Sequence, residues 1–311
     1  MTPQISVYCI GLGAMGWGIA ANVCKRGLSS KLVSRVYVWN RTQAKAQQHS
    51  FDFGTESVRN LTDVNEIDII ITCLPTSTEV ADIADQLVSL LKSGAIWIDC
   101  TSGDPHKSRE IGQKLGQCNI CFADCAVSGG PCGAISGELS AMVGSNNFDC
   151  VLPFISLFAR KKIVHCGDVG AGHAVKAINN TLNAAHLILG AEALIALKNF
   201  DIDPDKALQA INASSGRSLQ TEVRIPKEVL TRNFNYGFKL GLMAKDIQTA
   251  SESLNIPPNF MLYSTHIFLT RALSEHGSDA DYTELVKTLE SEANVQLNLA
   301  QSSIIQSANK N

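Results

Sequence analysis

The sequence predicts an α/β protein, with an N-terminal doubly wound parallel sheet followed by an all-α C-terminal domain that a long helix joins to it. Short apolar segments alternate with helical segments over the first half of the chain, which is typical of parallel βαβ units. The apolar segments are nearly continuous, as expected for strands that are covered on both faces. From residue 172 onward, only helical patterns follow.

The predicted strands are short, apolar and rich in β-branched residues, which favour strands. They cover residues 5–10, 36–39, 68–74, 95–99, 120–123, 139–143 and 163–165. Helical spacing predicts helices between the first five strands, at residues 15–26 (which Gly27 would close), 42–49, 80–91 and 104–115. Helices in these positions would cover both faces of a parallel sheet.

The pattern changes near residue 167. A single helical stretch without proline runs from Gly172 to Asn199. Further helices are expected at residues 204–214, 225–231, 243–254, 259–275 and 282–293. We therefore predict an α/β domain over residues 1–167 and an all-α domain over residues 168–311.

The composition is that of an ordinary globular protein: 311 residues, 45% hydrophobic and 18% charged, with a formal net charge of −3. No cluster of Lys and Arg suggests a nucleic-acid or anionic-membrane surface. The first predicted strand begins at Ile5, which leaves no room for a targeting segment. No apolar run approaches the roughly 18 residues of a membrane span. We therefore expect a cytoplasmic protein without nucleic-acid or membrane partners.

Ten cysteines are scattered along the chain. Several, such as Cys9 and Cys73, lie inside predicted strands, which favours buried free thiols in a reducing compartment. Cys118, Cys121 and Cys125 lie close enough in sequence to suggest zinc, but the strand between them would have to bend back on itself and no second ligand pair follows. We therefore predict no metal site.

A glycine-rich segment at residues 11–16 matches the pattern G-x-G-x-x-G directly after a buried strand and at the start of a helix. The first glycine allows a tight turn, the second lets a pyrophosphate approach the backbone, and the third lets the helix pack on the strand. The anion then lies at the positive end of the helix dipole. The segment predicts a dinucleotide site of the Rossmann type, formed by Gly11, Leu12, Gly13, Ala14, Met15 and Gly16.

The second strand ends in Asn40-Arg41-Thr42, without the carboxylate that usually binds the ribose 2′-OH of NAD. Arg41 can instead pair with a 2′-phosphate, and Asn40 and Thr42 can add neutral hydrogen bonds. We therefore favour NADP(H) over NAD(H). The third and fourth strands end at the same sheet edge, where we expect the nicotinamide ribose to be flanked by Leu74, Pro75, Thr101 and Ser102.

Three further segments complete a pattern: DCAVSGGPCGAISG at residues 124–137, GHAVKAINN at residues 172–180 and LMAKD at residues 242–246. With the glycine-rich segment and the NRT after the second strand, the chain resembles the β-hydroxyacid dehydrogenase family over about residues 5–300. The family includes 3-hydroxyisobutyrate dehydrogenases, tartronate and succinic semialdehyde reductases and, more distantly, 6-phosphogluconate dehydrogenase.

The resemblance implies a role for each matching position. Lys176 falls on the catalytic lysine, and Asn180 on a helix neighbour that contacts substrate. The loop that holds the substrate carboxylate falls on Ser128, Gly129 and Gly130. Lys245 and Asp246 fall on a Lys-Asp pair whose lysine approaches cofactor and substrate, and Ser102 falls near a nicotinamide-side hydroxyl. Two departures are mild: Ala126 stands where the family often has Pro, and Thr101-Ser102 stands where it often has Ser-Thr.

The residues themselves support these roles. Lys176 and Asn180 are four apart on a predicted helix, so they share one face. The helix is apolar almost all round from residue 184 to 197, which indicates burial, so we expect Lys176 to line an internal cleft. A Ser-Gly-Gly turn can present several backbone N–H groups to an anion. We interpret His173 as a structural or cap-region residue, because it points to a different side of the helix from Lys176.

The sequence thus predicts an NADP-dependent 3-hydroxyacid dehydrogenase or semialdehyde reductase, in which Lys176 acts as general acid and base on a small carboxylate-bearing substrate. The resemblance also implies a homodimer or homotetramer. One alternative is an imine reductase, which shares this architecture but usually replaces the lysine. Another is a non-catalytic NADP-binding scaffold, such as relatives that carry extra reader modules and lack the lysine.

Overall fold

The computed structural model describes residues 5–299 of the chain. The chain divides into two compact units, Met1–Lys176 and Ala177–Asn311, and the division lies inside helix α7 (Ala171–Asn199). Each unit is described by itself below.

The first unit is built on one eight-stranded sheet with the order β3-β2-β1-β4-β5-β6-β7-β8. All neighbouring strands are parallel except β6 and β7. This is the doubly wound arrangement that the sequence predicts. The strands are β1 (Ser6–Ile10), β2 (Arg35–Trp39), β3 (Glu56–Ser57), β4 (Ile67–Thr72), β5 (Leu91–Asp99), β6 (Cys121–Ser128), β7 (Ser140–Ser145) and β8 (Lys162–Gly167).

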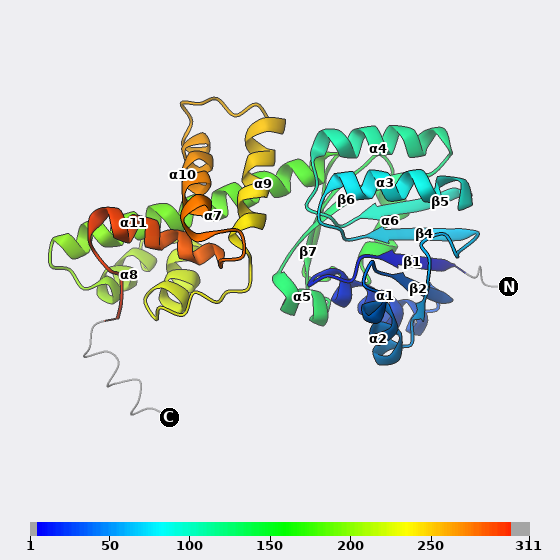
Figure 1. Cartoon of the computed structure of the whole chain (residues 1–311), viewed down its shortest axis with the longest axis horizontal. Helices are drawn as coiled ribbons and strands as arrows, with labels where there is room; N and C mark the ends of the chain where they lie inside the picture. Colours follow the sequence, from blue (N-terminus) through cyan, green and yellow to red (C-terminus); the bar gives the residue numbers. More distant parts are fainter. Residues whose placement is uncertain (1–4, 300–311) are drawn as a thin grey trace. The chain divides into compact units, whose positions relative to one another are not determined.

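Helices cover both faces of this sheet (Figure 1). Strand residues alternate between the faces: Val7 and Cys9 belong to one apolar core, and Tyr8 and Ile10 to the other. The first core is closed by α1 (Gly16–Ser29), α2 (Gln43–Phe53), α5 (Gly130–Ser136) and α6 (Phe148–Ile155). The second is closed by α3 (Ser77–Leu87), the 3₁₀ turn η1 (Val88–Leu90) and α4 (Pro105–Gln117).

Several elements differ from their predicted bounds. Helix α1 continues past Gly27 to Ser29, because Gly27 is a packing position: a Cβ there would lie 2.8 Å from the Val33 side chain. Strand β6 extends to Ser128 and pairs there with Ser140, so the short connection through α5 returns the chain at the same sheet edge and makes β7 antiparallel. The sequence did not predict α5 or α6.

Up to residue 299, the second unit is built of helices without strands, as predicted. After α7 come α8 (Pro204–Asn212), the π-helix η2 (Gln220–Val229), α9 (Leu240–Ser253), α10 (Met261–His276), the 3₁₀ turn η3 (Tyr282–Glu284) and α11 (Leu285–Ala293). Its core packs α7 residues such as Leu187 and Leu194 against Ile225, Met243 and Tyr282. The π-helix begins five residues before the predicted start at Ile225; its wider turn accommodates Pro226, which offers no N–H.

Among residues 5–299, one helix, α7, is long and apolar enough to cross a membrane by length and composition. The expectation that no segment approaches such a span is therefore wrong for this helix. Half of its most apolar stretch is buried inside the protein, and a buried core helix passes the same test.

Candidate cofactor and active site

The glycine-rich turn after β1 has three glycines with different surroundings. Gly11 has a φ of +95°, and a Cβ there would lie 2.3 Å from the Cys73 carbonyl oxygen. A Cβ on Gly16 would lie 2.0 Å from the Gly11 carbonyl oxygen. A Cβ on Gly13 would meet no atom within 4 Å. Gly11 and Gly16 are thus required by packing, whereas the space over Gly13 is open to a ligand.

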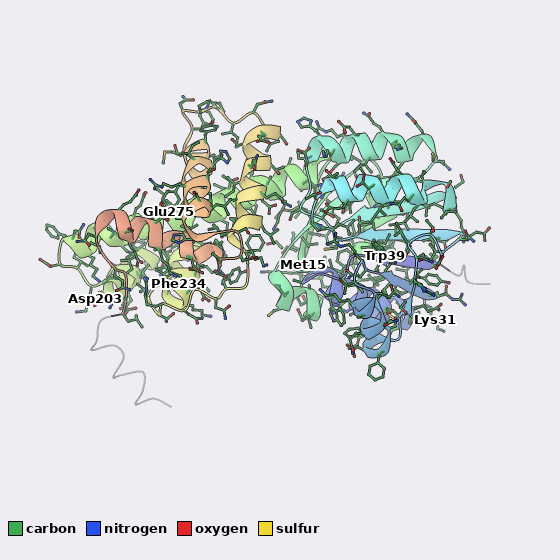
Figure 2. The ribbon with its side chains drawn as sticks, viewed as in Figure 1. Met15, Lys31, Trp39, Asp203, Phe234 and Glu275 are labelled. Carbon is green, nitrogen blue, oxygen red and sulfur yellow. The ribbon has the colours of Figure 1, made fainter. Side chains whose placement is uncertain are left out.

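Helix α1 begins beside this open space and offers a positive end. Met15 occupies the position before its first residue and makes no side-chain cap hydrogen bond, and no acidic residue lies in the first turn. The first backbone N–H groups of a helix have no partner within the helix, so this end suits a phosphate. Figure 2 labels Met15 at this helix start and Trp39 at the end of β2. The Trp39 carbonyl accepts a hydrogen bond from the Gly11 N–H at 3.0 Å.

The predicted ribose-phosphate residues follow β2. Asn40 is already bonded: its Oδ1 accepts from the Leu12 N–H at 2.9 Å, and its Nδ2 donates to the Thr42 carbonyl at 3.1 Å. Arg41 is exposed and makes no ion pair with residues 5–299. Thr42 precedes α2, and its hydroxyl makes no cap hydrogen bond. The guanidinium at this helix start suits an added anionic group.

The ends of β4 and β5 are tied together at the same edge of the sheet. The Leu74 N–H donates to the Thr101 hydroxyl at 3.1 Å, and the Thr101 N–H donates to Asp99 Oδ1 at 3.1 Å. The Thr72 hydroxyl also donates to this fully buried carboxylate, at 2.8 Å. These bonds order the segments that hold the predicted residues Pro75 and Ser102.

Ser128 is the last residue of β6, and the next two residues turn sharply. Gly129 has a φ of +140° and Gly130 a φ of +66°, which other residues rarely adopt. Helix α5 begins at Gly130 and packs against α1 at Gly18, where a Cβ would lie 2.4 Å from the Ala134 backbone. The predicted anion-binding turn is therefore also the start of a short helix.

Lys176 is half-buried near the start of α7, in the first unit. Sequence reasoning missed the residue that holds this start, Asp124. Its carboxylate is fully buried and accepts hydrogen bonds from the N–H groups of Gly170 and His173. Burial raises the pKa of Asp124, against the opposing effects of His173 and the bonded N–H groups. His173 is itself buried, with its ring bonded to Ser108, which agrees with a structural role.

The second unit brings together three of the predicted residues. Asn180 Nδ2 donates to Asp246 Oδ2 at 2.7 Å, and both side chains are almost fully buried. The Lys245 amine lies 3.4 Å from Asp246 Oδ1. A buried carboxylate between an amide and an ammonium fixes the orientation of that amide.

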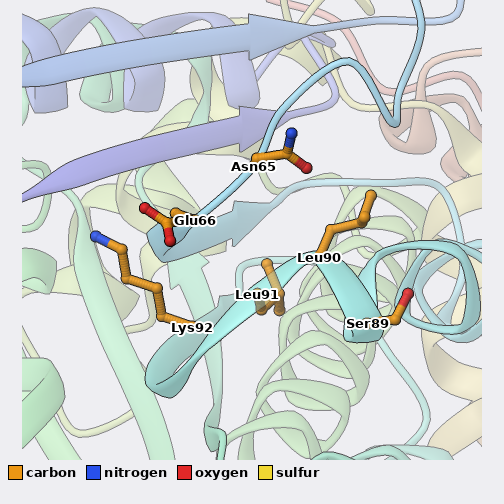
Figure 3. Close-up of a pocket in the computed structure, with 6 residues that line it drawn as sticks. All are labelled: Asn65, Glu66, Ser89, Leu90, Leu91 and Lys92. Atoms are coloured by element: carbon orange, nitrogen blue, oxygen red, sulfur yellow. The ribbon is translucent and has the colours of Figure 1, made fainter.

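A shallow depression of about 480 Å³ lies elsewhere on the first unit (Figure 3). Its lining comes from the segment before β4, from η1 and from the first residues of β5: Asn65, Glu66, Ser89, Leu90, Leu91 and Lys92. These are the amino-terminal ends of the strands, whereas the glycine-rich turn follows a carboxyl-terminal end. The depression therefore lies at the opposite edge of the sheet from the glycine-rich turn.

The cysteines are free thiols. Cys9 and Cys125 in the sheet and Cys100 directly after β5 are buried, and burial raises the pKa of Cys9. The Cys125 side chain and burial together raise the pKa of Cys100. Burial, with Cys150 beside it, raises the pKa of Cys121 to about 11. In the described part of the chain, no three His, Cys, Asp or Glu side chains gather into a group that would hold a metal ion.

Comparisons with known proteins cover both units. A family model described as the NAD binding domain of 6-phosphogluconate dehydrogenase matches residues 6–167. Another, described as NAD-binding of NADP-dependent 3-hydroxyisobutyrate dehydrogenase, matches residues 170–289. The chain is 31% identical over 276 residues to 2-(hydroxymethyl)glutarate dehydrogenase of Eubacterium barkeri, covering 86% of this chain and 89% of that protein. It is 32% identical over 256 residues to mitochondrial 3-hydroxyisobutyrate dehydrogenase of Homo sapiens, covering 78% and 74%.

Solved structures show the same fold. A 3-hydroxyisobutyrate dehydrogenase of Mycobacterium tuberculosis with L-serine has a TM-score of 0.83 at 24% identity, over 92% of this chain and 99% of that chain. Psf3 in complex with NADP+ and 2-OPP has a TM-score of 0.74 at 22% identity, over 92% and 100%. An imine reductase of Streptomyces aurantiacus is more distant, with a TM-score of 0.56 at 17% identity, over 91% and 99%.

Proposed function

This chain belongs to the β-hydroxyacid dehydrogenase family, and on that premise we propose that it is an NADP(H)-dependent oxidoreductase of a small β-hydroxy acid or its semialdehyde, with Lys176 as general acid and base. The observation that carries the proposal is that the open glycine turn and the lysine-bearing start of α7 belong to one compact unit. A cytoplasmic location and a homodimer or homotetramer are part of the same proposal.

The choice of NADP(H) rests on the end of β2. A 2′-phosphate there would meet the exposed Arg41 guanidinium at the start of α2, and the three residues directly after β2 include no carboxylate to repel it. Asn40 contributes by holding the turn, because its side chain is engaged with Leu12 and Thr42. The NADP+ named in the Psf3 complex belongs to a protein of the same fold and is consistent with this choice.

A bound nicotinamide supplies or accepts the hydride. The residues of the chain hold the substrate and move its proton. In reduction, the Lys176 ammonium donates a proton to the substrate carbonyl oxygen, and in oxidation the neutral amine accepts the hydroxyl proton. The Ser128 hydroxyl and the N–H groups of Gly129 and Gly130 bind the substrate carboxylate. Asn180, oriented by Asp246, binds the substrate from α7.

Turnover of a panel of short hydroxy acids and semialdehydes with both nicotinamide cofactors tests the activity. Lys176→Ala should lower kcat by about 10²–10⁴-fold, the usual contribution of a positioned acid or base, while NADPH still binds. Lys176→Arg should recover little, because a guanidinium does not give up its proton. Lys114→Ala, which removes a surface lysine of the same unit paired with Asp85, serves as the control. Near-normal kcat in either Lys176 variant would remove the assignment.

The two alternatives give different results in the same assays. An imine reductase would reduce a cyclic imine and leave succinic semialdehyde untouched. A non-catalytic scaffold would bind NADPH without turnover of any aldehyde in the panel. Lys176 favours carbonyl and alcohol chemistry over both, because the resemblance implies that those relatives usually replace this lysine.

A further inference from the structure

The Asp124 carboxylate fastens the start of helix α7 to the sheet. Its Oδ1 accepts a hydrogen bond from the Gly170 N–H at 2.6 Å, and its Oδ2 accepts one from the His173 N–H at 2.7 Å. The side chain projects from β6 and is fully buried. Because the first N–H groups of a helix have no partner inside the helix, a carboxylate that binds two of them fixes where the helix begins.

Two glycines permit this close approach. A Cβ on Gly144 of β7 would lie 2.3 Å from Asp124 Oδ1 and 2.9 Å from the Ala171 nitrogen. A Cβ on Gly172 would lie 2.4 Å from the Met142 carbonyl oxygen and 2.8 Å from Asp124 Oδ2. A side chain at either position would push the helix start away from the sheet.

The His173 ring provides a second attachment, to helix α4. The Ser108 hydroxyl donates to the Asp104 carbonyl at 2.9 Å, so its oxygen accepts from His173 Nδ1, 2.7 Å away. Gly103 leaves room for the ring, since a Cβ there would lie 2.6 Å from His173 Nδ1. The first turn of α7 is therefore held from β6 and from α4.

Lys176 follows His173 by three residues on this helix, so whatever fixes the first turn also fixes the origin of the lysine side chain. We propose that Asp124 is a positioning residue for Lys176: by capping α7 it holds the amine at the place where proton transfer occurs. The proposal rests on the proposed function, because it assumes that Lys176 is the acid and base.

Two variants of Asp124 test this role. Asp124→Asn keeps the shape but leaves one acceptor oxygen, and Asp124→Ala leaves none. We expect kcat to fall about 10-fold in Asp124→Asn and about 100-fold in Asp124→Ala, because displacing a catalytic group by about 1 Å can lower the rate about 100-fold. KM and the Kd for NADPH should stay the same. Amide hydrogen exchange should rise over residues 170–176 and remain unchanged in the strands.

Asp203 offers a matched control. It lies at the start of α8 (labelled in Figure 2), where its carboxylate accepts from the N–H groups of Asp205 and Lys206 at 2.9 and 3.2 Å. Asp203→Ala should raise hydrogen exchange at the start of α8 and leave kcat unchanged.

The outcomes separate the two proposals. Faster exchange at the start of α7 with normal kcat in Asp124→Ala would overturn the positioning role, and so would a parallel loss of NADPH affinity without local change in exchange. Normal kcat in Lys176→Ala would overturn the proposed function instead, whatever the exchange shows. If Asp124→Ala does not fold, Asp124→Asn and Ser108→Ala decide the question: normal kcat in both overturns the positioning role. Ser108→Ala removes the ring attachment together with the Ser108 bond to the Asp104 carbonyl and keeps the Asp124 carboxylate.

Discussion

The Asn40 side chain holds the backbone of Leu12, accepting its N–H in a hydrogen bond of 2.9 Å. This bond joins the end of β2 to the middle of the glycine-rich turn. The residue that follows the second strand therefore shapes the phosphate-binding turn, in addition to any contact with the ribose. Replacing the Asn40 amide by a carboxylate would add a negative charge at this point and keep the oxygen that accepts the Leu12 N–H.

Asn40→Asp should shift the cofactor preference toward NADH. The carboxylate keeps an oxygen for the Leu12 N–H, so the turn stays in place. Its negative charge repels a 2′-phosphate, whereas its second oxygen can accept a hydrogen bond from the ribose 2′-hydroxyl of NADH. We expect the ratio of kcat/KM for NADPH over NADH to fall at least about 10-fold, which corresponds to about 1.4 kcal/mol. Steady-state kinetics with both cofactors measures the ratio.

Asn40→Ala is the comparison for that variant, because it removes the acceptor without adding charge. It should weaken both cofactors to a similar extent. An unchanged ratio in Asn40→Asp would show that this position does not face the 2′-phosphate.

Gly13 and Gly16 should respond to alanine in opposite ways. Gly16→Ala places a Cβ 2.0 Å from a backbone oxygen, so we expect a loss of about 1–3 kcal/mol in the free energy of unfolding. Gly13→Ala meets no protein atom and should keep normal stability, but its methyl group occupies the approach of the pyrophosphate, so the Kd for NADPH should rise. Denaturant unfolding and NADPH titration of both variants measure the two effects.

Gly116→Ala, near the end of α4, is the control, because a Cβ there also meets nothing within 4 Å. It should leave both stability and NADPH binding close to normal. A Gly13→Ala variant that binds NADPH as well as the Gly116 control would argue against a pyrophosphate over the turn.

Tyr282 should make the protein less stable in alkali. Its side chain is fully buried, and burial, with a smaller effect of Tyr236, raises its pKa to about 12, above the usual value of 10.0. The folded state favours the neutral phenol, so the contribution of Tyr282 to the free energy of unfolding is complete below pH ~10. This contribution, about 2–3 kcal/mol, is lost as the pH rises toward ~12. Urea unfolding at several pH values between these limits measures the loss.

Tyr282→Phe keeps the ring and removes the ionisable group. In this variant, the free energy of unfolding should fall less between pH ~10 and ~12 than in the unmodified protein, although other groups still titrate there. Identical pH dependence in the two proteins would mean that Tyr282 ionises without penalty.

The strands that build the dinucleotide site could be predicted from sequence because each is a buried apolar run. The helices that could not be predicted have unfavourable local sequences. Helix α5 reads GPCGAIS, with two glycines and a proline, and it forms where Gly18 lets it pack against α1. Helix α6 is short, highly apolar and contains Pro153, so its pattern cannot be distinguished from a strand. The reversal of β7 depends on pairing with β6, which no local pattern encodes.

The candidate site shows the same division. The glycine turn and the positions of Lys176 and Asn180 follow from spacing along the chain. The bonds from Asn180 to Asp246 and from Asp124 to α7 join residues 66 and at least 46 positions apart, which spacing does not reveal. One signal was available for Asp124: a carboxylate inside an apolar strand must find partners when it is buried.

The close contacts of Asp124 with Gly144 and Gly172 also have an evolutionary consequence. A Cβ at 144 would lie 2.9 Å from the Ala171 nitrogen, and a Cβ at 172 would lie 2.4 Å from the Met142 carbonyl oxygen, so replacing the acid alone leaves a backbone clash at each glycine. Divergent homologues that lack the acid at 124 should therefore keep both glycines, and the alignment columns for 144 and 172 should vary less than the column for 124.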